Sequence, residues 1–293
     1  MSTTVPRAAR EYTERWCESG EIGHVEFSGG ARVRYLRVGN GPPLVLMHTV
    51  RTQLDHFQFV IPRISDAFTV YAVDFPGMGW SDIVPGAGYE EPALRAAVVR
   101  VVQELDLSDL TLAGESMGAT LALTASLDLG DRVRRVVAFN TYDFADGVKR
   151  ANPLARVVVG NIRLPVWGPI FARLENKQVL AAILRGGLHD AGKLPDHYLD
   201  ELRRVGRRPG YPTVSRAIYL NLESLIAARA RYERIDVPVT LVYGDDDWSR
   251  RSDRQANIET IPGARHIALP DIGHFAALEA PQDVARILLD KTS

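Results

Sequence analysis

The sequence contains one cysteine, Cys17, among its 293 residues. A lone cysteine excludes an intramolecular disulfide and a metal site built from several thiolates, and its polar N-terminal surroundings indicate an incidental residue. Long apolar runs are missing as well. No stretch approaches the roughly 18 apolar residues of a membrane span, and residues 1–20 contain no apolar core of signal-peptide length. These absences predict a cytoplasmic protein that does not bind membranes.

A strong net charge is also absent, because 35 lysines and arginines oppose 36 aspartates and glutamates. With no run of five or more like charges, nucleic acid and anionic membranes are not expected as main partners. Repeats at a solenoid period and low-complexity tracts are missing too. The composition is that of an ordinary globular protein. We expect a small-molecule substrate as the partner, leave a homodimer open, and find nothing that implies a metal or an organic cofactor.

Short apolar runs alternate with helical patterns on both sides of a central helical block. Continuous apolar runs suit parallel strands that are buried on both faces, whereas apolar residues at helical spacing indicate core-facing helices. The predicted strands are 31–38, 42–48, 68–74, 110–114, 133–140, 237–244 and 264–270, and the predicted helices outside the block are 90–107, 117–130 and 281–290.

The central block, residues 141–232, shows helical patterns joined by segments rich in proline and glycine, without a clear strand. Strand–helix alternation interrupted in this way indicates one α/β core with an inserted helical cap. We predict a mostly parallel, twisted central sheet of about eight strands with helices on both faces. The predicted core comprises 1–140 and 233–293, and the predicted cap, or lid, comprises 141–232.

One serine stands at the junction of a predicted strand and a predicted helix, in the pattern Gly114-x-Ser116-x-Gly118. A turn this tight forces its central residue into an unfavourable backbone conformation, and the flanking glycines let strand and helix approach without a clash. The serine oxygen is lifted above the carboxyl ends of the strands, where open parallel sheets bind ligands. Ser116 is therefore a candidate nucleophile, and a loop that merely turns the chain is the alternative.

A serine nucleophile needs a histidine base, and the expected chain order is serine, acid, histidine. His274 lies in a glycine-containing loop past the last strand, from which its ring can reach the serine. His189 and His197 belong to the helical block. We interpret His266 as a packed structural residue of its strand. His274 is thus the candidate base.

The acid should follow the preceding strand, where three aspartates at 245–247 come directly after Gly244. Adjacent carboxylates repel one another, so at least one should face solvent. We expect Asp245 and Asp246 to form a solvated acidic turn, which leaves Asp247 as the candidate acid.

Several segments together resemble the α/β-hydrolase fold family, over about residues 24–290. GESMG resembles its nucleophile turn, and VDFPGMGWSD (73–82) resembles a D-x-P-G-x-G-x-S loop beneath the site. YGDDD resembles a strand-end G-x-x-D that selects Asp247, and DIGHF resembles the loop that selects His274. LVLMH, ending at His48, resembles the strand before the oxyanion loop, and the block 141–232 falls where the family inserts a cap.

The resemblance implies acyl chemistry. Ser116 would attack a carbonyl carbon, His274 would take the serine proton, and Asp247 would hold the ring before water opens the acyl-enzyme. The backbone N–H groups of Val50 and Met117 would form the oxyanion hole. In some members of the family the acid follows the strand before the cap, so Asp143 is a lower-ranked alternative.

The oxyanion loop departs from the family pattern, which usually has a glycine after the histidine. Thr49 stands there, and a β-branched residue resists positive φ. The loop must therefore differ locally or use the threonine hydroxyl as an extra donor. Arg51 follows, and it either recognises a substrate carboxylate or, ranked first, pairs with a buried acid such as Asp55.

A serine at position 116 argues against the haloalkane dehalogenase and epoxide hydrolase branches, for which the resemblance implies an aspartate nucleophile. We predict hydrolysis of a carboxylic ester, lactones and thioesters included. The alternatives are hydrolysis of a carbon–carbon bond in a diketone-type substrate and a ligand receptor with a slow triad. The apolar cap favours a small-to-medium hydrophobic substrate. Candidate pocket walls, for which packing within the cap is an equal alternative, are Trp167, Phe171, Tyr211, Tyr219 and Leu222.

Overall fold

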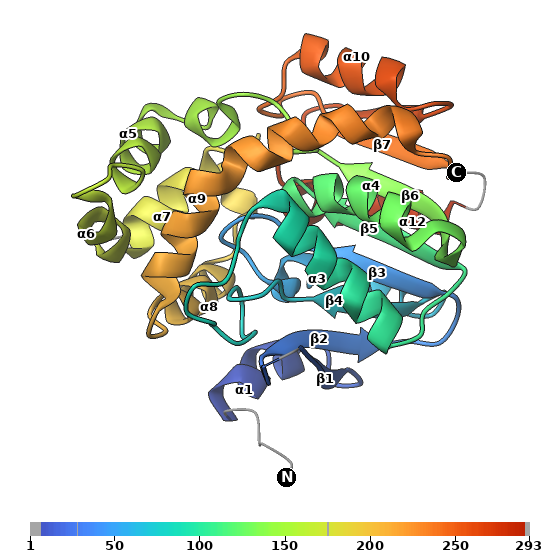
Figure 1. The fold of residues 1–293 in the computed structure, drawn as a ribbon, viewed down its shortest axis with the longest axis horizontal. Helices are drawn as coiled ribbons and strands as arrows, with labels where there is room; N and C mark the ends of the chain where they lie inside the picture. Colours follow the sequence, from blue (N-terminus) through green and yellow to red (C-terminus); the bar gives the residue numbers. More distant parts are fainter. Residues whose placement is uncertain (1–6, 28, 175, 291–293) are drawn as a thin grey trace.

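One eight-stranded sheet forms the centre of the computed structural model, which describes residues 7–27, 29–174 and 176–290 (Figure 1). The strand order is β1-β2-β4-β3-β5-β6-β7-β8. β1 and β2 pair antiparallel, β2 joins β4 antiparallel, and all other pairs are parallel. The predicted mostly parallel sheet is therefore confirmed. The strands are β1 (Glu21–Glu26), β2 (Arg32–Val38), β3 (Pro43–Met47), β4 (Thr69–Val73), β5 (Leu110–Glu115), β6 (Val133–Phe139), β7 (Val239–Gly244) and β8 (Arg265–Leu269).

Helices cover both faces of the sheet, as predicted. Leu112 of β5 and Val136 of β6 pack in the core beneath α3 and α4, whereas the next residues, Ala113 and Val137, pack in the core on the opposite face. This alternation follows from the pleat of a strand. α3 and α4 lie in front of the sheet in Figure 1. The helices of the core are α2 (Ile61–Ile64), α3 (Glu91–Glu104), α4 (Met117–Leu129), α10 (Arg251–Thr260), α11 (Ala276–Glu279) and α12 (Pro281–Leu289).

Burial along the strands depends on their place in the sheet. β5 and β7, which have a neighbour on each side, are buried at every residue, as their continuous apolar sequences require. β8 lies at the edge and is largely exposed, and His266 is exposed with it. The interpretation of His266 as a packed residue is therefore wrong, because no layer of side chains covers this edge strand at that position.

Two N-terminal elements were not predicted, β1 and the helix α1 (Arg7–Trp16). α1 is amphipathic but short and mostly polar, so a search for apolar runs passes over it. Tyr12 and Trp16 pack against hydrophobic clusters of the core, and polar contacts add to this packing. The hydroxyl of Thr13 and the indole N–H of Trp16 each donate to Asp55, at 2.8 Å.

Between β6 and β7 the described residues form helices and no strand. Figure 1 shows these helices gathered beyond one end of the sheet. Asn152 and Asn176 begin two of them by accepting the N–H of Ala155 and Val179 at 2.7 and 3.0 Å, which satisfies donors left free at a helix start. The helices are α5 (Pro153–Ile162), α6 (Gly168–Arg173), α7 (Lys177–Arg185), α8 (Asp196–Gly206) and α9 (Tyr211–Ala227). Within the described ranges, none of the helices has both the length and the apolar character needed to cross a bilayer.

Candidate active site

Ser116 occupies the sharp turn between β5 and α4. Its backbone has φ 59° and ψ −117°, a region that residues with a side chain rarely adopt. The two flanking glycines permit close approach. A Cβ atom on Gly114 would lie 2.4 Å from the carbonyl carbon of Gly118, and one on Gly118 would lie 2.1 Å from the carbonyl oxygen of Met47. Any larger residue at either position would push the helix away from the sheet.

His274 and Asp247 meet Ser116 from two other loops. Nε2 of His274 lies 2.8 Å from Oγ of Ser116, and Nδ1 of the same ring contacts Oδ1 of Asp247. All three side chains are buried. An ionised carboxylate can only accept a hydrogen bond, so Nδ1 carries the proton and Nε2 of the neutral ring accepts from the serine hydroxyl. The arrangement is a continuous path for one proton from the serine to the ring.

The Asp247 carboxyl is held in its ionised form despite burial. Burial opposes its ionisation, but the electrostatic interaction and hydrogen bond with His274 and the hydrogen bonds from Ser249 outweigh this effect and lower its pKa. The backbone N–H of Ser249 donates to Oδ2 of Asp247 at 3.0 Å, and the Ser249 hydroxyl contacts the same oxygen. Asp245 and Asp246 are exposed, as predicted for a solvated turn.

Two residues that sequence reasoning missed hold the histidine loop in place. The Asn140 amide donates to the carbonyls of Gly273 and His274 at 3.1 and 3.0 Å, and its oxygen accepts the N–H of Gly244 at 2.9 Å. Trp248 stacks on the His274 ring, with centroids 3.9 Å apart and an angle of 14° between the planes. Neither residue belongs to a short motif. The one available signal was an asparagine at the end of the strand that precedes the helical block.

Replacing Asn140 with alanine is expected to lower kcat about 10- to 100-fold, because three bonds that join the loops of the acid and the histidine are lost and small displacements are costly. Steady-state kinetics on an aryl ester measures the effect. Asn221→Ala, which removes a bond within α9 to the carbonyl of Ala217, is the matched control and should change kcat little. Equal kcat values for wild type and Asn140→Ala would contradict the assigned positioning role.

Asp143, the alternative acid, does not contact His274. Its carboxylate accepts from the hydroxyl of Tyr232 at 2.8 Å and from the amide of Asn257 at 2.9 Å, and burial raises its pKa. The structure therefore places Asp143 in a separate buried polar cluster, and the carboxylate at the histidine is that of Asp247.

The structure of the loop after β3 explains how a threonine, Thr49, can stand where the family pattern usually has glycine. The residue with positive φ is Arg51, at 64°, and not the β-branched Thr49. His48 fixes the start of this loop. Its Nε2 accepts the N–H of Phe75 at 3.2 Å, so its Nδ1 donates to the carbonyl of Thr49 at 2.8 Å. Val50 lines the same pocket as Ser116.

A pH-dependent loss of stability is expected from His48. Burial lowers its pKa from the ordinary 6.5 to about 4. Between these two pH values the unfolded chain binds a proton at His48 and the folded chain does not. The free energy of unfolding therefore falls by about 3 kcal/mol as the pH drops from about 6.5 to about 4. Urea denaturation across this range measures the slope. His48→Gln should show a shallower slope, and an equal slope in both proteins would contradict the expectation.

The space around Ser116 is narrow and mostly apolar. The cavity, here called the Ser116 pocket, has about 30 Å³ of free volume, the share of a single water molecule in the liquid. Thr49, Val50 and Arg51 form one side. Side chains of the helical block and of the loops that carry Asp247 and His274 form the rest, among them Tyr142, Val148, Leu180, Ile183, Leu184, Tyr219, Leu222, Trp248 and Phe275. A substrate therefore requires these side chains or the helical block to move.

The predicted pocket walls divide into two groups. Tyr219 and Leu222 line the Ser116 pocket, and Tyr211 lines a neighbouring cavity. Trp167 and Phe171 line neither, and Trp167 is 60% exposed. The placement of Trp167 at the substrate is thus wrong, because the residue precedes α6 on the outer surface of the helical block. Other exposed apolar residues of this region are Leu154, Val157, Leu164, Val166, Ile170 and Leu174.

Arg51 does not pair with Asp55, which corrects the favoured expectation for this residue. The Asp55 carboxylate faces α1 and the buried guanidinium of Arg34, 3.8 Å away, on the far side of the loop. Arg51 lies instead against Tyr211, with its guanidinium carbon 5.0 Å from the ring centroid, and it lines the Ser116 pocket. Its charge is therefore near the position a substrate would take.

One group of potential metal ligands occurs among the described residues, formed by His189, Asp246 and Asp271. All three are exposed, and their ligand atoms lie within 4.8 Å of one another. None of them lines the Ser116 pocket.

Comparisons with known proteins agree with the geometry of the sheet. Haloalkane dehalogenase 2 of Mycobacterium tuberculosis is 25% identical over 290 residues, covering 96% of this chain and 95% of that protein. The 2-(acetamidomethylene)succinate hydrolase of Mesorhizobium japonicum is 25% identical over 255 residues, covering 83% and 85%. A mutant of haloalkane dehalogenase DatA from Agrobacterium tumefaciens is a structural neighbour with a TM-score of 0.82 at 22% identity, covering 94% of this chain and 97% of its own.

The structural likeness at this identity shows the fold alone. A family model provides the stronger evidence, because the one that describes the alpha/beta hydrolase fold matches residues 42–281, which include Ser116, Asp247 and His274. Since this match covers most of the sequence, the chain belongs to the alpha/beta hydrolase fold family.

Proposed function

We propose that this hydrolase cleaves carboxylic esters through an acyl-enzyme on Ser116. The observation that carries the proposal is the 2.8 Å contact between Oγ of Ser116 and Nε2 of His274, with Asp247 on the other ring nitrogen. His274 takes the serine proton as Oγ attacks the carbonyl carbon, and then gives it to the leaving alcohol. Water, deprotonated by the same ring, hydrolyses the acyl-enzyme and regenerates the serine.

The N–H groups of Val50 and Met117 hold the oxyanion in this proposal. Met117 is the first residue of α4, where a helix leaves its N–H groups without an intrahelical acceptor and its dipole favours negative charge. Val50 approaches from the loop after β3, and the missing side chain of Gly118 lets that loop and α4 lie close together. Two such donors stabilise a tetrahedral intermediate by several kcal/mol relative to water.

A serine nucleophile favours acyl chemistry over the dehalogenase and epoxide hydrolase activities for which several relatives are named. Haloalkane dehalogenases and an epoxide hydrolase are among the similar proteins. Opening an epoxide or displacing a halide joins the nucleophile to an alkyl carbon. An aspartate then leaves an ester that water can cleave, whereas a serine would leave a stable ether. Ser116 thus suits a carbonyl substrate, with lactones and thioesters in the same class.

Carbon–carbon bond hydrolysis of a diketone-type substrate is a second candidate, because Arg51 borders the Ser116 pocket and can hold a carboxylate of such a substrate. The apolar walls of the pocket suit a hydrophobic acyl group next to the reacting carbonyl in either case.

Stopped-flow hydrolysis of 4-nitrophenyl butyrate tests the proposal, together with a panel of a lactone, a thioester, an aromatic diketone acid, 1-bromobutane and styrene oxide. An acyl-enzyme predicts a burst of one nitrophenolate per protein followed by sustained turnover. A burst that then stops would indicate a receptor with a slow triad. Turnover of the bromide or the epoxide without turnover of any acyl substrate would overturn the proposal.

A further inference from the structure

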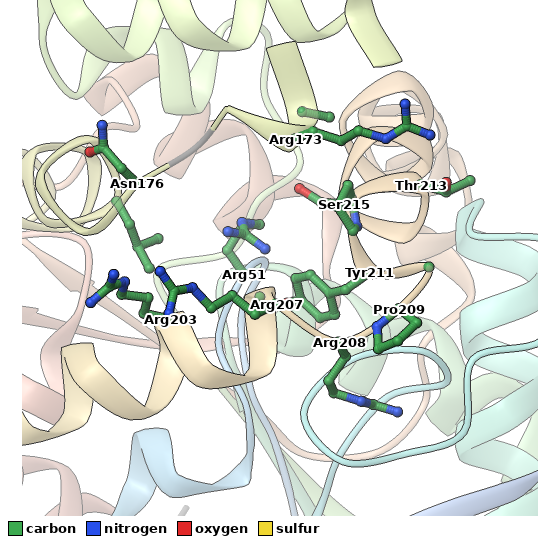
Figure 2. Close-up of a pocket in the computed structure, with 15 residues that line it drawn as sticks. Arg51, Arg173, Asn176, Arg203, Arg207, Arg208, Pro209, Tyr211, Thr213 and Ser215 are labelled. Carbon is green, nitrogen blue, oxygen red and sulfur yellow. The ribbon is translucent and has the colours of Figure 1, made fainter. Parts of the chain in front are cut away.

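A second cavity, of about 500 Å³, adjoins the Ser116 pocket, because Arg51 and Leu180 line both (Figure 2). We call it the arginine cavity, since its lining includes Arg51, Arg173, Arg203, Arg207 and Arg208. Its size falls within the range of small-molecule sites, whereas the Ser116 pocket alone is far below that range. A substrate with its carbonyl at Ser116 therefore has room for its remaining part in the arginine cavity.

The charge of this cavity is of one sign among its described lining residues, which include no aspartate or glutamate. Such a concentration stands out in a chain with a net charge of −1. The neighbouring Arg204 contacts Glu201. Within the described ranges Arg173, Arg203 and Arg207 make no ion pair, and Arg203 and Arg207 are exposed. Their charge is thus available to a ligand.

The arginines differ in where they point. Figure 2 shows Arg203 and Arg207 extending from the end of α8 beneath Arg51, with Arg173 across the cavity. Arg208 points away, and its guanidinium donates to the carbonyls of Gly79 and Ser81, the latter at 2.7 Å. Arg51 lines both cavities, and Arg203 and Arg207 line the arginine cavity with it.

A cavity lined by one sign of charge concentrates small ions of the opposite sign. Guanidinium groups bind carboxylate and phosphate oxygens in pairs of parallel hydrogen bonds. Resting on the proposed function, we propose that the substrate is an ester with an anionic group, a carboxylate or a phosphate, remote from the scissile carbonyl. Arg51, Arg203 and Arg207 bind this group while the apolar walls of the Ser116 pocket hold the segment between. This proposal differs from the expectation of a small-to-medium hydrophobic substrate and takes up the alternative that Arg51 recognises a substrate carboxylate.

Matched substrates test the inference. Mono-4-nitrophenyl esters of succinate, adipate and suberate carry a terminal carboxylate, and 4-nitrophenyl butyrate, hexanoate and octanoate are their neutral counterparts of equal chain length. At the best length, kcat/KM for the anionic ester is expected to exceed that of its counterpart about 10-fold or more, and to fall as salt is added. The double variant Arg203→Gln/Arg207→Gln should lose this ratio while keeping the rate on neutral esters.

Arg134→Gln is the control, because Arg134 is exposed at the start of β6, the end of that strand away from Ser116. It should leave both rates unchanged. A ratio of one at every length, or a ratio that the double variant retains, would overturn the inference while the proposed function stands. If the wild-type protein hydrolysed none of these esters, neutral or anionic, that result would instead contradict the proposed function.

A binding measurement tests the anion site separately from the proposed ester hydrolysis, because it needs no turnover. Calorimetric titration of Ser116→Ala protein with suberate, and separately with inorganic phosphate, is expected to give saturable binding that weakens about 10-fold or more when Arg203→Gln/Arg207→Gln is added. The anion that binds more tightly identifies the group. Absence of saturable binding of both anions would overturn the inference, whatever the outcome with esters.

Discussion

Replacing Ser116 with alanine is expected to lower kcat on 4-nitrophenyl butyrate by at least about 10³-fold, because the atom that attacks the carbonyl is removed. The backbone strain at this residue is the same for serine and alanine, since both carry a Cβ atom at positive φ. The variant should therefore unfold at the wild-type urea concentration. Kinetics and urea denaturation on the same preparation separate lost chemistry from lost folding.

Ser126→Ala provides the matched control for this substitution. Ser126 lies on α4, as buried as Ser116, and its hydroxyl donates to the carbonyl of Leu123 at 2.7 Å. Its replacement removes a serine hydroxyl from the same helix without touching the Ser116 pocket. The kcat of this variant should stay within a factor of about two. Activity of Ser116→Ala close to that of Ser126→Ala would show that another residue attacks the substrate.

Changing Asp247 to asparagine should lower kcat by about 10³- to 10⁴-fold. An amide NH₂ in place of Oδ1 favours a proton on the opposite nitrogen of His274, so Nε2 no longer accepts from the serine hydroxyl. The imidazolium that forms during the reaction also loses its carboxylate. The low pKa of Asp247 keeps its carboxylate ionised at neutral pH. The full difference in kcat between wild type and Asp247→Asn should therefore appear at neutral pH and become smaller only in acid.

Asp143→Asn is the comparison that assigns the acid. Both aspartates are fully buried in their loops, but only Asp247 contacts His274. Asp143→Asn should therefore keep kcat within about 10-fold, although an NH₂ group in place of one accepting oxygen in the cluster with Tyr232 and Asn257 lowers the stability of the protein. A fall in kcat as large as that of Asp247→Asn would contradict the assignment of Asp247.

Local patterns were enough to predict the sheet and the turn at Ser116. Continuous apolar runs report strands buried on both faces, and β5 and β7 follow them closely. The G-x-x-D spacing after β7 led to Asp247, and the structure brings that residue to His274. Elements at the edge of the sheet were harder to predict, because the burial of their side chains depends on which other segments cover them. β1 and the exposed His266 of β8 are the examples.

The surroundings of the site could not be predicted, because they depend on residues that meet only after folding. Asn140 and Trp248 act on His274 from other loops, and neither has a motif of its own. Arg51 and Arg203 are far apart in the sequence and line one cavity. Aromatic character alone suggested Trp167 as a pocket wall, but a helix can turn such a residue to its outer surface.

A fluorophosphonate probe followed by mass mapping tests the central claim most directly, because the probe reacts only with an activated nucleophile. The account predicts one adduct per chain on Ser116, formed at least about 100-fold more slowly in His274→Ala, which lacks the ring 2.8 Å from the serine oxygen. An adduct on a different residue, or equal labelling rates in wild type and His274→Ala, would contradict the account.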